Sequence, residues 1–118
     1  MAKDEAMLIL RLFAEVGCLE EAEAMADAVI SKLEPFAIPR RRETKGYWKI
    51  PEYYEVFLEL EPKGEIDVAF SHILSVLASG WKCYGPSDAM WAIWNPAPGS
   101  TFFSPTVRWA NLEIVRHD

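Results

Sequence analysis

The sequence predicts an α+β fold in which an antiparallel sheet carries two helices on one face. Strict alternation of apolar and polar residues marks one strand, and two segments carry apolar residues at helical spacing. The order along the 118 residues is β-α-β-β-α-β-β, which is the split β-α-β arrangement of ferredoxin-like folds with an extra C-terminal strand. No repeat or linker divides the chain, so we expect residues 1–118 to form a single domain.

Residues 7–16 predict the first strand, and the segment between Gly17 and Pro35 predicts the first helix. The strand alternates between a leucine face and a mixed face that carries Ile9, Arg11 and Phe13. Pro35 ends the helix because proline cannot continue the backbone hydrogen bonding. The expected buried stripe of this helix consists of Leu19, Ala22, Ala26, Val29, Ile30 and Leu33.

The middle of the chain predicts two more strands and the second helix. Residues 40–49 form a polar strand whose run RRRETK is typical of an edge strand protected by charge. Residues 53–61 form the most regular strand, with alternating faces. A PKG turn leads into a helix over residues 65–79, which Gly80 ends. The buried stripe of this helix is Ile66, Phe70, Ile73, Leu74 and Leu77.

The last third of the chain is strand-like and rich in aromatic residues. Residues 81–84 and 89–95 predict a strand that a turn or bulge interrupts at 85–88. The segment PAPGSTFFSP predicts a loop, and residues 107–115 predict the closing strand. If the apolar faces of all strands pack on the helices, the opposite face mixes large aromatic residues with acids. That face carries Arg11, Phe13, Tyr53, Phe57, Glu59, Trp109 and Glu113.

The net charge of −6 is unevenly distributed. The first 34 residues carry eight acids against three bases, residues 35–50 carry five bases against one acid, and residues 51–67 carry six acids against one base. An acidic protein is repelled by nucleic acid and by anionic membranes, so we expect neither partner. A nucleic-acid site at Arg40, Arg41 and Arg42 is a further alternative that this charge balance disfavours. No segment reaches the roughly 20 apolar residues of a membrane span.

Residues suited to catalysis or metal binding are sparse. Of the two histidines, His117 is near the C-terminus, and His72 lies beside the buried stripe of the second helix, where a structural role is expected. The cysteines Cys18 and Cys83 fit no metal pattern, and without a secretory signal we expect free thiols in the cytoplasm. Carboxylates at Glu55, Glu59 and Glu61 alternate along a strand, which is typical of a solvated face. We therefore expect no enzyme activity, no metal and no cofactor.

The stretch WAIWNPAPGSTFFSPTVRWANLEI resembles the C-terminal part of bacterial immunity proteins that accompany polymorphic toxins. These proteins belong to contact-dependent growth inhibition, Rhs and type VI secretion systems. The resemblance covers mainly residues 88–114. It implies a cytoplasmic, non-enzymatic protein that binds and neutralises a cognate toxin domain. A nuclease toxin has a basic cleft, which an acidic inhibitor would complement.

The leading hypothesis is therefore an immunity protein with an acidic and aromatic binding surface. The candidate partner-binding residues are Glu55, Glu59, Glu61, Trp91, Trp94, Phe102, Phe103 and Trp109. An equal alternative for the aromatic residues is that the loop over 95–106 folds across this face and forms a second small core. The alternative function is a ferredoxin-like small-molecule binding or catalytic domain, possible as a homodimer, with His72 or Tyr47 pointing into a cavity between sheet and helices.

Overall fold

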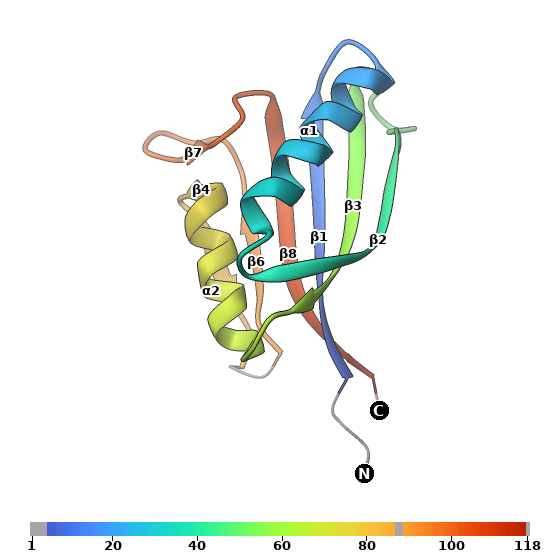
Figure 1. Ribbon diagram of the computed structural model, residues 1–118. Helices are drawn as coiled ribbons and strands as arrows, with labels where there is room; N and C mark the ends of the chain where they lie inside the picture. Colours follow the sequence, from blue (N-terminus) through green and yellow to red (C-terminus); the bar gives the residue numbers. More distant parts are fainter. Residues whose placement is uncertain (1–4, 87–88, 118) are drawn as a thin grey trace.

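The computed structural model describes residues 5–86 and 89–117 and confirms the α+β fold (Figure 1). The long elements are β1 (Glu5–Glu15), α1 (Leu19–Leu33), β2 (Ala37–Gly46), β3 (Tyr53–Pro62), α2 (Ile66–Leu77) and β8 (Val107–His117). The short strands between α2 and β8 are β4 (Ala78–Ser79), β5 (Lys82–Tyr84), β6 (Trp91–Trp94) and β7 (Thr101–Phe102). Both helices lie on the same face of the main sheet.

The main sheet is antiparallel and has the strand order β2-β3-β1-β8-β6-β5. Its four-strand part, β2-β3-β1-β8, has the ferredoxin-like order, with β3 and β1 in the middle. The strands beyond this pattern, β5 and β6, precede β8 in the chain and form a hairpin at the sheet edge. The turn predicted at 85–88 falls in this hairpin, and its residues 87 and 88 lie outside the described residues.

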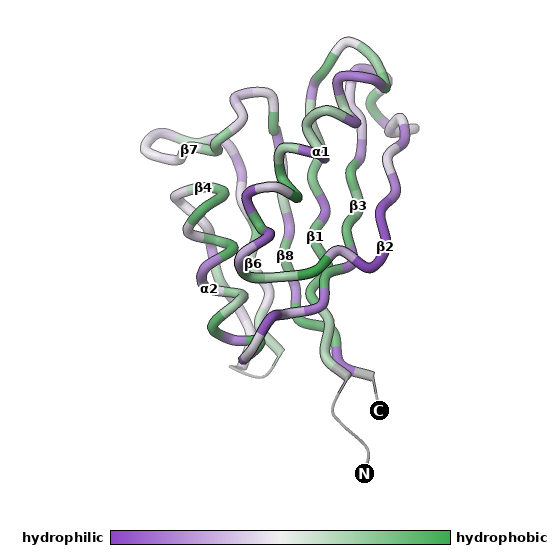
Figure 2. Tube along the Cα trace, viewed as in Figure 1, coloured by the Kyte–Doolittle hydropathy of each residue, from purple (hydrophilic) through white to green (hydrophobic). Residues whose placement is uncertain are grey.

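The core lies between the sheet and the two helices. Leu10 of β1 is flanked in register by Leu58 of β3 and Leu112 of β8, and all three side chains are fully buried. From the helices, Val29, Phe70 and their neighbours complete this layer. Figure 2 shows hydrophobic and hydrophilic colours mixed along the central strands and hydrophilic colour along most of β2. Alternation along each strand therefore assigns one face to the core, as the sequence predicts.

The edge strand β2 begins at Ala37, three residues before the predicted start at Arg40. Pro39 lies inside it, and the register shifts between Pro39 and Arg41. Proline is tolerated here because β2 has a neighbour on one side only and the irregularity removes the need for its N–H. The predicted edge position of the basic run is confirmed.

The helix α2 ends at Leu77, earlier than the predicted Ser79, because the chain turns directly into β4. Ala78 already has an extended backbone, and Gly80 adopts φ +98° in the turn between β4 and β5. The strands β4 and β7 pair with each other as a separate two-stranded sheet beside one end of α2.

The segment over 95–106 packs on the helix side of the sheet, so the prediction that it covers the opposite face is wrong. The Phe103 N–H donates to the Leu77 carbonyl at 2.8 Å, and the Lys32 ammonium of α1 lies 5.1 Å from the Phe103 ring centre. Thr106 contacts the Met25 sulfur of α1. The loop contacts both helices, and its aromatic side chains extend the core at the helix ends.

Candidate functional site

The sheet face opposite the helices, here called the open face, carries no helix within the part of the chain that the structure describes. Its side chains come from the alternate positions of the central strands, which the register fixes. They are Ile9, Arg11, Phe13, Tyr53, Glu55, Phe57, Glu59, Glu61, Trp91, Ile93, Trp109, Asn111 and Glu113. Most of them are half-buried, because neighbouring large side chains shield one another.

The centre of the open face is organised around Phe57. The guanidinium of Arg11 lies 5.5 Å from the Phe57 ring centre, and that of Arg41 lies 5.2 Å from it. Both arginines are register partners of β3 residues, Arg11 of Phe57 itself and Arg41 of Glu59. Each such cation–π contact contributes about 0.5–1 kcal/mol at an exposed site. The contacts also fix the direction of two long side chains.

An aromatic pocket occupies the end of the open face near the β2–β3 connection. Its lining residues are Phe13, Tyr47, Ile50, Tyr53 and Trp109, and its volume is about 350 Å³. The Phe13 ring meets the rings of Tyr47 and Trp109 edge to face, with centres 4.7 Å and 5.3 Å apart. Register places Phe13 directly opposite Trp109. The pocket is therefore built on the rigid central strands and closed on one side by a connection.

Backbone hydrogen bonds hold the β2–β3 connection against the pocket. The Tyr47 N–H donates to the Tyr53 carbonyl, and the Tyr53 N–H donates to the Ile50 carbonyl, each at 2.9 Å. These bonds bring Tyr47 and Ile50 over the end of β1. Trp48 points outward and is 81% exposed, with the Lys49 ammonium 5.2 Å from its ring centre. The connection thus adds two walls to the pocket and one exposed tryptophan beside it.

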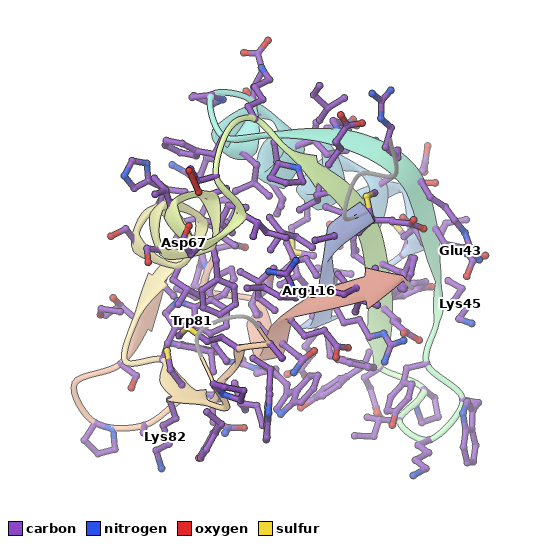
Figure 3. All side chains as sticks on the ribbon, turned by 90° about the horizontal axis from the view of Figure 1, so that it is seen from below. Glu43, Lys45, Asp67, Trp81, Lys82 and Arg116 are labelled. Carbon is purple, nitrogen blue, oxygen red and sulfur yellow. The ribbon has the colours of Figure 1, made fainter. Side chains whose placement is uncertain are left out.

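A second aromatic cluster lies at the opposite edge of the open face. The rings of Tyr84 and Trp91 stack with their centres 4.6 Å apart and an interplanar angle of 26°. Both side chains are exposed, and the two residues are register partners between β5 and β6. Lys82 belongs to the edge strand β5, whereas Glu43 and Lys45 belong to β2 at the opposite edge of the sheet (Figure 3).

Carboxylates on the open face differ in whether a base compensates them. Glu61 forms an ion pair with Arg40 at 2.5 Å. Glu43 on the edge strand lies within 4 Å of both Arg41 and Lys45. By contrast, no ion pair within residues 5–86 and 89–117 involves the remaining three glutamates of the open face. These three are Glu55, Glu59 and Glu113.

The eight predicted contact residues divide between the two sides of the sheet. Five of them lie on the open face, namely Glu55, Glu59, Glu61, Trp91 and Trp109. Trp94, Phe102 and Phe103 lie on the helix side and pack against the core. Trp94 is buried, and its indole N–H donates to the Ser79 carbonyl at 2.9 Å. We therefore correct the set and remove these three from the candidate surface, since they stabilise the fold.

Two residues of the aromatic pocket, Tyr47 and Ile50, were not among the predicted surface residues. Strand alternation already assigned Phe13, Tyr53 and Trp109 to this face, and the structure confirms that assignment. Tyr47 and Ile50 belong to a connection without periodicity, so no sequence pattern shows where their side chains point. The predicted alternative that Tyr47 enters a cavity between sheet and helices is wrong, because Tyr47 lies on the other face.

Groups suited to catalysis are not gathered in the described structure. His72 is exposed on α2 and contacts the Phe36 ring edge to face, with centres 4.9 Å apart. Both cysteines are free and exposed. Within residues 5–86 and 89–117, no group of three histidine, cysteine or acidic side chains could hold a metal ion. Neither helix in this part of the chain has the length and apolar character needed to cross a membrane.

The residues with shifted pKa values lie where α1 meets β2, away from the open face. The Arg42 guanidinium donates hydrogen bonds to Glu23 and Asp27 of α1, at 2.8 Å and 2.7 Å. The hydrogen bond from Arg42 lowers the pKa of Glu23, and the bonds to Glu23 and then Asp27 raise the pKa of Arg42. This cluster ties the edge strand β2 to the first helix.

No known family, curated protein or solved structure gives a significant match to this chain.

Proposed function

We propose that this chain binds a protein partner through its open face and acts as an immunity protein that neutralises a bacterial toxin domain. The observation that carries the proposal is the composition of this face. Two aromatic clusters, around Trp109 and around Trp91, lie at its two ends, and three carboxylates that form no ion pair with any described residue lie between them or beside them.

Several physical properties of the open face support protein binding. Tryptophan and tyrosine are enriched at interface hot spots because they bury a large area at low cost in side-chain entropy. The strands that carry Trp91 and Trp109 are paired within the sheet, so little order must be gained on binding. The carboxylates of Glu59 and Glu113, which form no ion pair among the described residues, would attract a basic surface and raise the rate of association.

The choice of a toxin as partner rests on the resemblance in residues 88–114 and on chemistry. A nuclease toxin needs a basic cleft to hold its substrate. An inhibitor that presents carboxylates between aromatic anchors complements such a cleft. The proposal includes a cytoplasmic, non-catalytic role, in which the bound chain blocks the cleft or a surface next to it.

Native co-purification tests the proposal. The tagged chain is recovered from its own bacterium, and bound proteins are identified by mass spectrometry. We expect a toxin domain at equal stoichiometry, and we expect loss of this partner in the Trp91→Ala variant. Leu19→Ala is the matched control, since Leu19 is an exposed apolar residue on the helix layer and the prediction that it lies in the buried stripe is wrong. Equal loss of the partner in both variants, or retention in both, would contradict binding through the open face.

A second candidate function is small-molecule binding, and the aromatic pocket is the observation that favours it. Its volume of about 350 Å³ falls at the lower end of the range for ligand pockets.

A homodimer formed through two open faces would also bury these aromatic residues. Sedimentation velocity on the purified chain distinguishes a monomer from a homodimer, because a monomer at micromolar concentration excludes the stable homodimer.

A further inference from the structure

We infer that the aromatic pocket binds the cationic end of a lysine or arginine side chain that a protein partner presents. The inference rests on the proposed function and deepens it, because it names the chemical group that anchors the partner. It depends on the pocket formed by Phe13, Tyr47, Ile50, Tyr53 and Trp109 and on the charge next to that pocket.

The arrangement of the rings suits a cation. Phe13 is nearly perpendicular to both Tyr47 and Trp109, with interplanar angles of 68° and 66°. Rings that meet edge to face present their electron-rich faces in several directions around the pocket. A positive charge placed against such faces is attracted by the ring quadrupoles, most strongly by that of tryptophan. Ile50 adds an apolar wall for the aliphatic stem of the side chain.

The protein already places cations on other rings of the same region. Arg11 and Arg41 lie over Phe57, and Lys49 lies over Trp48. These bases are therefore engaged outside the pocket. Within the described residues, no cation of the chain itself lies over Phe13, Tyr53 or Trp109. The pocket rings remain available to a positive charge from a partner.

Glu55 supplies the complementary charge. It is the register partner of Phe13 and lies two residues from Tyr53 on the same face of β3. Its side chain is half-buried and takes part in no ion pair within residues 5–86 and 89–117. Lys45, its register partner on β2, approaches Glu43 instead, at 3.9 Å. A cation in the pocket would meet aromatic faces and a carboxylate that forms no ion pair among the described residues.

The test is a titration of the isolated chain with n-butylammonium, which mimics the lysine side chain, followed by NMR of the indole N–H signals. The neutral control ligand is 1-butanol. We expect the Trp109 signal to shift with saturation in the millimolar range, and the affinity for butanol to be about five-fold weaker. The buried Trp94 signal should stay in place. Equal affinity for the two ligands, or an unmoved Trp109 signal, would overturn the inference.

A pair of glutamine variants separates the carboxylate from the rings. Glu55→Gln should weaken butylammonium binding about three-fold or more and leave butanol binding unchanged, because only the charge is removed. Glu113→Gln is the matched control, since Glu113 lies opposite Trp91 at the other end of the face. An identical response of the two variants would show that Glu55 contributes no specific charge to the pocket and would overturn that part of the inference.

The titration also separates failure of this inference from failure of the proposed function. If butylammonium binds but no protein partner is found on the open face, the pocket stands and the proposed function fails. If a partner binds while neither the cation nor Glu55→Gln has the expected effect, the function stands and the inference fails.

Discussion

Trp91 and Trp94 lie three residues apart on β6 but on opposite faces of the sheet. Trp94 is 3% exposed and donates its indole N–H to the Ser79 carbonyl, whereas Trp91 is 38% exposed and stacks on Tyr84. An odd separation along a strand always reverses the direction of the side chain. Two tryptophans of one short strand therefore have different roles, one in stability and one on a candidate surface.

Alanine substitutions at these two positions should lower stability by different amounts. Trp94→Ala should lower the free energy of unfolding by about 3–5 kcal/mol, because it leaves a cavity and an unpaired carbonyl. Trp91→Ala should lower it by only about 1–2 kcal/mol, since the side chain is already partly hydrated and loses mainly its stacking on Tyr84. Denaturant unfolding of both variants measures the difference. Equal destabilisation would contradict the assignment of Trp91 to a solvent-facing position.

Charge reversal at Glu59 should slow association with a basic partner. Glu59 lies on the open face without an ion pair within the described residues, so Glu59→Lys replaces an attractive charge by a repulsive one. At low salt we expect the association rate constant to fall about ten-fold and the effect to shrink as salt is added. Stopped-flow measurement at two ionic strengths records both changes.

The control for this experiment is Glu34→Lys, which makes the same change of net charge at the exposed end of α1. It should leave the association rate nearly unchanged, because the charge lies on the helix layer. Glu61→Lys is less informative, since it also breaks the ion pair with Arg40. A similar slowing by Glu34→Lys would indicate a net-charge effect and not a local one.

Gly80→Ala should destabilise the fold more than Gly64→Ala. Both glycines have positive φ, +98° and +89°, so the backbone is strained in both alanine variants. A Cβ at Gly80 would also come within 2.8 Å of the Ser100 Cβ, whereas a Cβ at Gly64 meets nothing within 4 Å. We expect the free energy of unfolding to fall by about 3 kcal/mol or more in Gly80→Ala and by about 1–2 kcal/mol in Gly64→Ala. Thermal unfolding of both variants, with Ser100→Gly added to the first, tests whether relief of the collision restores stability.

The Arg42 cluster should make stability depend on pH in a defined direction. The hydrogen bond from Arg42 lowers the pKa of Glu23 below its ordinary value of 4.5. A lowered folded-state pKa stabilises the protein above about pH 4.5, and this contribution is lost as the pH falls through the lowered value. Arg42→Ala should therefore be less stable than the wild type at pH 7, and the difference should decrease toward pH 3. Urea unfolding at both pH values checks this, and a constant difference would contradict it.

Much of the fold could be predicted because burial and strand alternation agree. Along β3, Val56, Leu58 and Leu60 are buried, whereas Phe57 and Glu59 between them lie on the open face. The same period on β1 and β8 fixes which residues share each face. A slip of one residue would bury glutamates, so this pattern determines the register.

The remaining features depend on contacts that no local pattern contains. Tyr47 and Ile50 join the aromatic pocket only because the connection folds back onto the end of β1. The strands β4 and β7 have two residues each, which is too short for any period to show. Aromatic residues on a proline-stiffened loop suit either a binding surface or a core, and only the contacts of Phe102 and Phe103 show that they pack against the core.

The pairing of β1 with β8 has a consequence for folding during synthesis. Leu8 pairs with Ile114, so the centre of the sheet joins segments at opposite ends of the sequence. At a ribosomal rate of about 5–20 residues per second, the first strand waits roughly 5–20 s for its partner. During that time one edge of β1 is unsatisfied, and such an edge is prone to pair with other chains. Pairings this distant along the sequence also slow folding, because the chain loses the entropy of loop closure before the stabilising contacts form. Chaperone protection of the nascent chain would therefore matter most between the emergence of β1 and that of β8.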